Sequence, residues 1–501
     1  MFNKTKEFIK RVGVKMGLIK EIAGINNFKK INVSDSFYED ILTWKNLHKG
    51  YDKNIHEVNA FSLAKGQHTR KLATLNVPKL ISQEISTLIF NERCEISITA
   101  NDSFKELVED VFKRNNFNGN FQQYLEFMFA HGGMVIKPYL NVDKIDLSYS
   151  LAENFIPISW DNDKIKEGLF ITVSVKDKKY YKLLEWHTFN NEGLYSVRNE
   201  LYTSNDPNKI GVQVPLSNLY PDLVEEVTFS PQVDRPLFVY FKPNTANNIE
   251  NDSPLGISIY ANAIDTLRMI DTIYDSFIRE YKLGRKRMIV STQAIKHVNN
   301  RDGSQVRYFD ALDETYEAFD GSLNDNEVMK EVNSTLRVNE HVAGLNTALD
   351  TIATQIGFSA GTFSFNASGG LKTATEVVSE NSKTFRTKKS HENLIESNIT
   401  ELIQVIGLLA DEAGLVVNDP NLEVSVFFDD SIIQDKTAEI DNEIKLVGVG
   451  LQSKVAAIMN IFGLTRDEAI EKLREIIAEQ RDELPDMQTI IDDIAIGGDF
   501  E

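Results

Sequence analysis

Residues 253–281 read SPLGISIYANAIDTLRMIDTIYDSFIREY. From Ile257 to Tyr281 their apolar side chains recur three or four residues apart, which is the spacing of one face of an α-helix. Charged residues lie on the other faces, and Asp275 precedes Arg279 by four residues, a spacing at which opposite charges weakly support a helix. The sequence therefore predicts one long helix over 253–283, whose apolar stripe must pack on another element.

A second striped helix is predicted at 339–357. Its apolar residues are spaced three and four apart, Asn339 can cap its first turn, and Gly357 stands where a left-handed residue ends a helix. We expect the two stripes to pack on each other through four side chains: Ile264, Leu267, Leu349 and Ile352. Packing of the stripe on a neighbouring subunit is the alternative.

The remaining segments show a mixture of helical and strand patterns, so an α+β fold is expected. Helical spacing before Gly132 gives way to an antiparallel β pattern over 134–241, and short strands are expected at 288–290 and 306–309. The stretch 358–372 reads as a long loop. A helix follows from 373 to 413, opened by the capping-box pattern Thr373-Ala374-Thr375-Glu376. Its middle, over 382–392, is polar, which predicts a helix that is bent or partly exposed there.

Composition limits the classes of protein to consider. The chain has 501 residues, of which 42% are hydrophobic, so it can bury a sizeable core. Its one cysteine, Cys94, excludes an intramolecular disulfide, and the sequence shows neither a signal peptide nor an apolar run long enough to span a membrane. We therefore expect a protein of a reducing compartment, without a membrane partner.

Charge is distributed unevenly along the chain. Residues 1–30 hold eight Lys and Arg against two Glu, a net +6, whereas residues 411–501 hold 7 Lys and Arg against 22 Asp and Glu, a net −15. The first segment is interpreted as a loosely ordered basic arm, with a membrane-surface or partner-binding helix as the alternative. Since the whole chain carries −20, any contact with nucleic acid should be local, weak or transient.

No enzyme motif survives inspection. The stretch 368–373 has Leu371 where a phosphate-binding loop needs glycine, and His56-Glu57 lacks a second histidine at the zinc-protease spacing. Asp429, Asp430 and Asp435 are interpreted as a solvated turn. The sequence thus predicts a protein that is not an enzyme, with no catalytic residue, no cofactor and no metal.

Four stretches in order resemble one known family, the portal proteins of tailed double-stranded DNA bacteriophages, in the branch from phages of Gram-positive hosts. The stretches are Ser253-Pro254-Leu255-Gly256-Ile257-Ser258, Leu336-Arg337-Val338-Asn339-Glu340-His341, Gln355-Ile356-Gly357-Phe358-Ser359 and Lys372-Thr373-Ala374-Thr375-Glu376-Val377. Each is weak alone, but together they span about 250 to 410 at sensible spacing.

The resemblance implies a portal-like α+β fold assembled as a ring, usually of twelve subunits, at one capsid vertex. Carried onto this chain it gives the following parts: a basic N-terminal arm and entry (1–60), a wing of helices and then antiparallel β-structure (61–252), a first stem helix (253–283), a β-containing clip (284–338), a second stem helix (339–357), a tunnel loop (358–372), a long bent helix with a strand returning to the wing (373–431), and an acidic helical crown (432–501).

The implied function is a conduit through which the genome is packaged and ejected. The implied partners are other copies of the chain, double-stranded DNA held weakly and without sequence preference, the terminase large subunit, a head–tail connector or adaptor, and the major capsid and scaffolding proteins. The implied location is the portal vertex of the virion, with host cytoplasm during assembly.

Two sets of residues are predicted to make contacts in such a ring. Six in the tunnel loop are expected to touch DNA: Phe363, Ser364, Phe365, Asn366, Ser368 and Lys372. Five in the clip are expected to meet a neighbouring subunit or the terminase: Arg285, Lys286, Arg287, Arg301 and Arg307. Residues 281–307 carry a net +6 and 308–331 a net −7, so the two halves could pair between neighbours or within one chain.

Two alternatives to a portal protein stay open. A non-portal structural ring of a phage tail or secretion apparatus would lack the loop that precedes the long helix. A nucleic-acid-processing enzyme would need the missing phosphate loop or an acidic metal cluster.

Overall fold

A computed structural model describes residues 10–12, 33–62, 66–284, 287–291, 297–299, 305–307, 316–319, 329–332, 335–365, 380–429, 436–462 and 466–482. The chain divides into two compact units. The first holds the described residues up to 365 and from 381 to 428, and the second holds Glu380, Asp429 and those from 436 onward.

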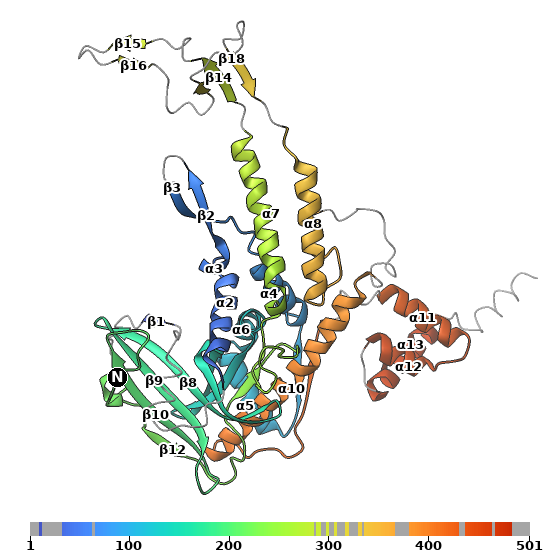
Figure 1. The fold of residues 1–501 in the computed structure, drawn as a ribbon. Coiled ribbons are helices and arrows are strands. Elements are labelled where there is room, and N and C mark those ends of the chain that lie inside the picture. The colour runs from blue at the N-terminus through green and yellow to red at the C-terminus, as the bar shows by residue number, and fades with distance from the viewer. Residues whose placement is uncertain are drawn as a thin grey trace, which may run out of the picture. The chain divides into compact units, whose positions relative to one another are not determined.

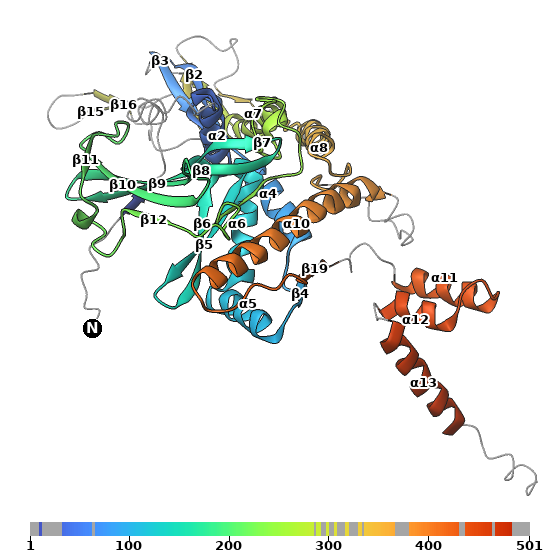
Figure 2. The same cartoon turned by 90° about the horizontal axis from the view of Figure 1, so that it is seen from below.

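Helices form the centre of the first unit. They are α2 (Asp35–His48), α3 (Lys53–His56), α4 (Val77–Ile89), α5 (Asp102–Arg114), α6 (Phe117–His131) and α10 (Ser382–Glu412). Their apolar faces meet in one core, in which Phe37, Trp44 and Phe121 are fully enclosed. Figure 2 shows α10 crossing beside α4 and α5, and contacts between these helices agree with that view.

Two antiparallel sheets pack beside these helices. Among the described residues the larger has seven strands, in the order β1-β8-β9-β10-β11, with β7 beside β8 and β12 beside β10. They are β1 (Lys10–Val12), β7 (Phe155–Asp161), β8 (Lys164–Lys176), β9 (Lys179–Phe189), β10 (Tyr195–Ser204), β11 (Val212–Val214) and β12 (Glu226–Thr228). A smaller sheet joins β13 (Val239–Phe241), β5 (Met134–Asn141) and β6 (Lys144–Leu151). The antiparallel region predicted over 134–241 is confirmed.

Two more antiparallel strand pairs belong to this unit. β2 (Glu57–Ser62) pairs with β3 (Gly66–Lys71) in a hairpin that lies near α7 (Figure 1). β19 (Glu423–Phe427) pairs with β4 (Glu95–Thr99), which returns the chain after α10 to its N-terminal half.

The N-terminal arm and entry predicted over 1–60 is wrong from residue 33 onward. Residues from 33 onward belong to the core, since α2 buries Phe37 and Trp44 on one side. Before residue 33 only β1 is described, and its backbone pairs with β8. The rest of the arm lies outside the described residues.

The first predicted stem helix is too long. The helix α7 runs from Ile264 to Leu283, and residues 253–260 precede it as an irregular segment followed by a short 3₁₀ turn at Ala261–Ala263. Ile257 and Tyr260 are buried in that segment, but the backbone N–H of Ile259 donates to the Phe129 carbonyl (3.0 Å) instead of to a helix. The stripe of buried residues therefore begins at Ile257, before the helical backbone of α7 begins at Ile264.

Glycine explains why this segment stays irregular. A Cβ at Gly256 would lie 2.3 Å from the carbonyl oxygen of Gly132, and Gly132 itself has φ +89°. Only residues without a Cβ allow the two backbones to approach this closely. The Pro254-Leu255-Gly256 turn thus fastens the chain to the end of α6 before α7 can begin.

α7 and α8 (Val338–Gln355) lie side by side (Figure 1). Between them in sequence are β14 (Arg287–Ser291), β15 (His297–Asn299), β16 (Gln305–Arg307), β17 (Tyr316–Phe319) and β18 (Met329–Val332). β14 pairs in parallel with β17 and antiparallel with β18, and β15 pairs with β16. The strands predicted at 288–290 and 306–309 are found, although the second ends at Arg307 in the described chain.

The middle of α10 is partly exposed, as its polar sequence predicted, with Arg386 and Lys389 at the surface, but one of its faces is buried. Lys388 and Glu392 are each 1% exposed or less, and the Lys388 ammonium lies 2.7 Å from the Glu392 carboxylate. His391 beside them is also buried, with its ring against Phe129. Because the two charges are four residues apart, they neutralise each other on one buried face. Residues 373–379, including the capping box predicted at Thr373–Glu376, lie outside the described residues.

The second unit contains three described helices: α11 (Lys436–Gly448), α12 (Lys454–Phe462) and α13 (Arg466–Asp482). Ala457, Ile458 and Ala469 are buried between them. The Asn460 amide donates to the Glu443 carboxylate (3.1 Å), which ties α12 to α11. The described part of the predicted crown is therefore helical, as the sequence indicated.

Candidate functional site

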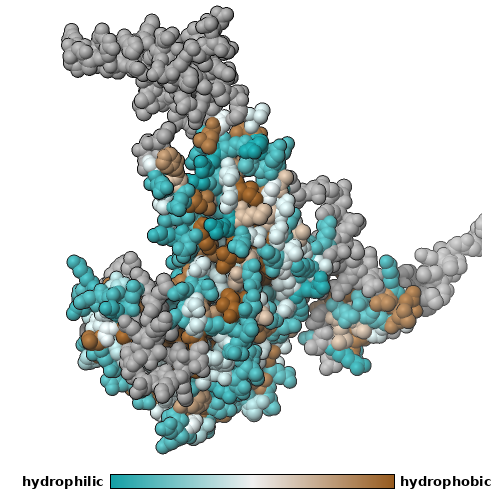
Figure 3. All heavy atoms as spheres, in the orientation of Figure 1, coloured by the Kyte–Doolittle hydropathy of each residue, from teal (hydrophilic) through white to brown (hydrophobic). Residues whose placement is uncertain are grey.

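The α7–α8 pair packs through apolar residues in the N-terminal half of α7 and the C-terminal half of α8. Leu267, Leu349 and Ile352 are buried in the common core, whereas Ile264 is partly buried at its margin. Ala348 and Ala353 are fully enclosed on α8. Small side chains at these positions let the two helices approach closely. Further along, the ring of Phe277 lies 5.1 Å from that of His341, and Figure 3 shows a mostly hydrophilic surface over this end of the pair.

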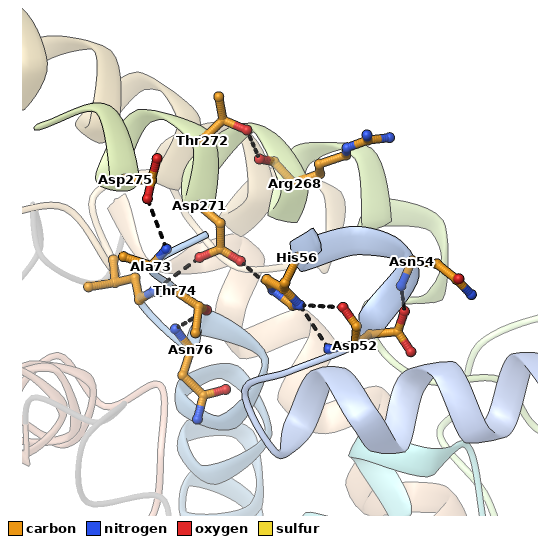
Figure 4. Close-up of polar contacts among 11 residues, drawn as sticks. Asp52, Asn54, His56, Ala73, Thr74, Asn76, Arg268, Asp271, Thr272 and Asp275 are labelled. Atoms are coloured by element: carbon orange, nitrogen blue, oxygen red, sulfur yellow. Dashed lines mark hydrogen bonds and ion pairs between the residues drawn. The ribbon is translucent and has the colours of Figure 1, made fainter. Parts of the chain in front are cut away.

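Two carboxylates of α7 face inward, although the sequence placed them on polar faces. Asp271 and Asp275 are buried. Asp271 accepts a hydrogen bond from the His56 imidazole (3.0 Å) and one from the backbone N–H of Leu75 (2.9 Å). Figure 4 shows these groups meeting beneath α7. The contacts join α7 to the segment between β3 and α4.

Asp275 is paired with a different arginine from the one its sequence spacing suggested. Both guanidinium Nη groups of Arg70 donate to it (2.9 and 2.7 Å), and the Ala73 N–H adds a third hydrogen bond (3.1 Å). Burial raises the pKa of Asp275, but hydrogen bonds from Arg70 and Ala73 outweigh it and leave the pKa below the ordinary value of 3.8. Arg279 is exposed and adds only a weaker attraction.

The tautomer of His56 follows from its neighbours. Nε2 carries a proton, because it lies 3.0 Å from the Asp271 carboxylate, which can only accept. Nδ1 lies 2.8 Å from the backbone nitrogen of Asp52 and 3.1 Å from its carbonyl oxygen. Asp52 also caps α3 by accepting from the Asn54 N–H (2.9 Å). Figure 4 shows the resulting chain from α3 through His56 to α7. These residues were missed in the sequence because the partners lie more than 190 residues apart.

A polar clamp joins α7 to α8 at the ends of the two helices next to the β-strand insertion. Glu280, near the end of α7, accepts from the backbone N–H and the Nε of Arg337 (both 3.1 Å) and from the His341 imidazole. Hydrogen bonds from Arg337 are the largest of the causes that lower the pKa of Glu280 to about 2. Arg337 precedes α8 directly, so the clamp fixes the two chain segments at the point where the β-strand insertion leaves and returns.

The Asn339 cap predicted for α8 is wrong. The residue that precedes the helix is Arg337, and its side chain makes no capping hydrogen bond to the first turn. The predicted C-terminal end is found: Gly357 has φ +89°. A Cβ there would lie 2.6 Å from the Thr387 hydroxyl, so glycine also provides room for α10.

The chain after Gly357 folds back along α8. The backbone N–H of Gly361 donates to Asp350 (2.7 Å) and that of Phe365 to Asn346 (3.0 Å). Phe363 packs on the buried Phe358, with ring centroids 5.4 Å apart, while Phe365 is 61% exposed. Of the residues predicted to touch DNA, Phe363 is thus held within its own chain, Ser364 is half-buried and Phe365 is exposed. Asn366, Ser368 and Lys372 lie outside the described residues.

Comparison with known families decides between the readings left open by the sequence. Residues 27–483 match the family described as "Phage portal protein, SPP1 Gp6-like". This chain belongs to that family of phage portal proteins. The predicted resemblance is confirmed over most of the sequence, and a non-portal ring protein is not favoured.

Other comparisons with this portal protein add less. No curated protein matches it. Among solved structures it is similar to a chain of the "Neck of native GTA particle computed with C12 symmetry", with 10% identity and a TM-score of 0.37 over 77% of this chain and 88% of that one. A likeness this distant carries no argument about function or assembly.

In the portal protein the two halves of the predicted clip pair within one chain. β14, from the basic half, hydrogen-bonds along its backbone to β17 and β18, from the acidic half. Met288 stands opposite Glu331, and Ile289 opposite Lys330. The backbones of the basic and acidic halves are therefore paired within one chain. Arg287 and Arg307 lie on β14 and β16, whereas Arg285, Lys286 and Arg301 lie outside the described residues.

Within the described chain there is no group of three or more His, Cys, Asp or Glu residues arranged to hold a metal ion. The same residues contain no helix long and apolar enough to cross a membrane. The portal family is structural. In this chain Glu280 ties α7 to α8 at one end of the pair, and Asp271 and Asp275 tie α7 to the chain before α4.

Proposed function

We propose that this portal protein assembles as a ring, of twelve subunits, at one capsid vertex, and that the genome is packaged and ejected through its axial channel. The observation that carries the proposal is the family match over 27–483, which includes the whole α7–α8 pair and its insertion. The polar clamp of Glu280 with Arg337 and His341 supports it further, since a conduit under load needs helices that do not shift against each other. The chain acts by structure and not as an enzyme.

The parts of the chain then take the following roles. α7 and α8 are the stem helices, 284–338 is the clip, 358–372 the tunnel loop, 61–252 with 373–431 the wing, and 432–501 the crown. The boundary of the first stem helix moves to Ile264, since residues 253–263 fasten it to α6.

Charge supports a channel in which DNA is not held. A surface that binds many phosphates through cations would have to release them as the duplex advances. Twelve chains at −20 each amount to −240, which repels the duplex from the wall. Contact with double-stranded DNA is accordingly weak and independent of sequence.

Its further partners are the terminase large subunit and the head–tail connector or adaptor, with the major capsid and scaffolding proteins around the ring. The protein is then found in the virion at the portal vertex, after assembly in the host cytoplasm. The basic clip residues Arg285, Lys286, Arg287, Arg301 and Arg307 contribute to a subunit or terminase contact.

The tunnel loop provides the experiment on function. Replacing Phe365 with Ser should leave the assembled protein ring and its thermal stability unchanged but reduce DNA packaging into proheads. The reason is that the Phe365 side chain is exposed and can meet the duplex. Replacing Phe363 with Ser is the matched control: it should lower stability, because Phe363 packs on Phe358. The measurement is packaging rate together with melting temperature.

Deleting Phe363 to Ser368 should abolish packaging while rings persist. If Phe365→Ser and the deletion both package at the wild-type rate, or if the deletion prevents ring formation, the loop does not contact DNA as proposed.

A further inference from the structure

A pocket of about 470 Å³ lies where the end of α8 meets the first turns of α10. It is lined by Asn244, Thr245, Gln355, Ile356, Gly357, Lys383, Arg386, Thr387, Ser390 and His391. The lining contains two cations, a histidine, hydroxyls and amides, and no carboxylate. In a chain of net charge −20 this composition is unusual, and it is that of a site for an anion.

The walls of the pocket are fixed by hydrogen bonds. Thr387 donates to the Gly357 carbonyl (2.7 Å), and the Lys383 ammonium donates to the Thr354 carbonyl (2.6 Å) at the end of α8. On the other side the Asn244 side chain donates to both the carbonyl and the hydroxyl oxygen of Ser390 (2.9 Å each). The pocket is therefore built by three separate segments of the chain.

His391 supplies a neutral donor. Its Nδ1 accepts from the Asn244 backbone N–H (3.0 Å), so the ring proton is on Nε2. Burial lowers the pKa of His391 to about 4, which keeps the ring neutral at pH 7. Its side chain is 3% exposed, and among the described residues no hydrogen bond is made by Nε2.

Arg386 supplies the charge. Its Nε donates to the Ser382 carbonyl (3.3 Å), and no carboxylate of the described chain pairs with its guanidinium. By contrast Arg70 and Arg337 are each paired with an acidic side chain. Lys383 and Arg386 also lie in the first two turns of α10, where a cation is disfavoured by the helix dipole. Helix stability therefore does not account for Arg386.

We propose that this pocket binds a phosphate group, held by the Arg386 guanidinium, the Nε2–H of His391 and the hydroxyl of Ser390. A guanidinium fork matches two phosphate oxygens, and the two neutral donors can take the others. Free phosphate and a phosphate of the DNA backbone share this chemistry. DNA as the source rests on the proposed function, whereas the site itself does not.

The first test is titration of the full-length protein with inorganic phosphate in a chloride buffer, followed by calorimetry. We expect saturable binding that Arg386→Gln weakens about tenfold, since a charged hydrogen-bond donor is lost. Ser390→Ala should weaken it less. Lys389→Gln is the matched control, because Lys389 is 64% exposed on the same helix, faces Glu392 and does not line the pocket.

Melting temperatures show whether each variant is folded. The proposal is overturned if phosphate does not saturate, or if Lys389→Gln weakens binding as much as Arg386→Gln, since the effect would then be one of general charge.

A second arm identifies the source of the phosphate. A short DNA duplex that displaces inorganic phosphate from the wild type, and binds Arg386→Gln more weakly than Lys389→Gln, assigns the site to the DNA backbone. A duplex that leaves phosphate bound assigns it to a free phosphate ligand. Failure of phosphate binding would rule out the proposed phosphate site. It would leave the portal proposal intact, because the ring and packaging tests do not involve Arg386.

Discussion

Replacing Leu349 with Ala should lower the free energy of unfolding by about 2–5 kcal/mol. Leu349 is 1% exposed on the inner face of α8, in the same core as Leu267 and Ile270 on α7, so truncation leaves a cavity that these neighbours cannot fill. Chemical denaturation measures the change. Thr351→Ala on the same helix is the control, since Thr351 is exposed and its loss should change stability by less than about 0.5 kcal/mol.

A double-mutant cycle with Leu267→Ala tests whether the two side chains pack on each other within one chain. Residues in contact show a coupling energy of about 0.5–3 kcal/mol. Absence of coupling would contradict a direct contact between Leu349 and Leu267. A loss of stability that depends on protein concentration would instead show that the stripe packs on a neighbouring subunit.

Replacing Arg70 with Met should cost about 3–5 kcal/mol, because it leaves the Asp275 carboxylate buried without its bidentate partner. Arg279→Met is the matched control: Arg279 is also an arginine near Asp275, but it is exposed and makes no hydrogen bond to it within the described chain. Its loss should cost less than about 1 kcal/mol. Equal effects of the two substitutions would contradict the assignment of Arg70 as the partner.

The same pair predicts a pH dependence. Because the folded-state pKa of Asp275 lies below 3.8, its contribution to stability is present above that value and is lost as pH falls through the lowered folded-state pKa. In Arg70→Met only burial and the weaker contacts remain, so the carboxylate should favour its protonated form. We therefore expect the deficit of this variant, relative to the wild type, to shrink on acidification from pH 7 to pH 4. A deficit that stays constant over this range would contradict the ion pair.

Local signals predicted α8 well. Its apolar residues repeat at helical spacing up to a glycine, and the backbone ends there in the left-handed conformation that glycine favours. The short strands predicted at 288–290 and 306–309 were also found. Alternation of apolar and polar residues, and the turn residues beside it, are signals that act over a few positions. These signals are local in the chain, which is why the sequence carries them.

The first stem helix was predicted too long for a physical reason. Ile257 and Tyr260 are buried like the helix stripe, and periodicity alone does not distinguish a buried helix from a buried irregular segment. What stops the helix is the approach of Gly256 to Gly132, a contact between segments more than 120 residues apart. No property of the stretch itself reveals that contact.

Buried charge was the other gap. Asp271 and Asp275 were placed on polar helix faces and Lys388 in a polar segment, yet the fold encloses each of the three with a hydrogen-bond or ion-pair partner. For α7 the partners are His56 at the end of α3 and residues of the chain between α3 and α4. Charged residues in a helical pattern do not reveal such partners, because the pairing depends on tertiary packing.

Electron microscopy of the purified full-length protein tests the central claim most directly. The account predicts closed rings with an axial channel whose wall is formed by α7 and α8, with the loop after Gly357 at its lumen. Particles without an axial hole, or rings in which the α7–α8 pair lies on the outer surface away from the channel, would contradict it.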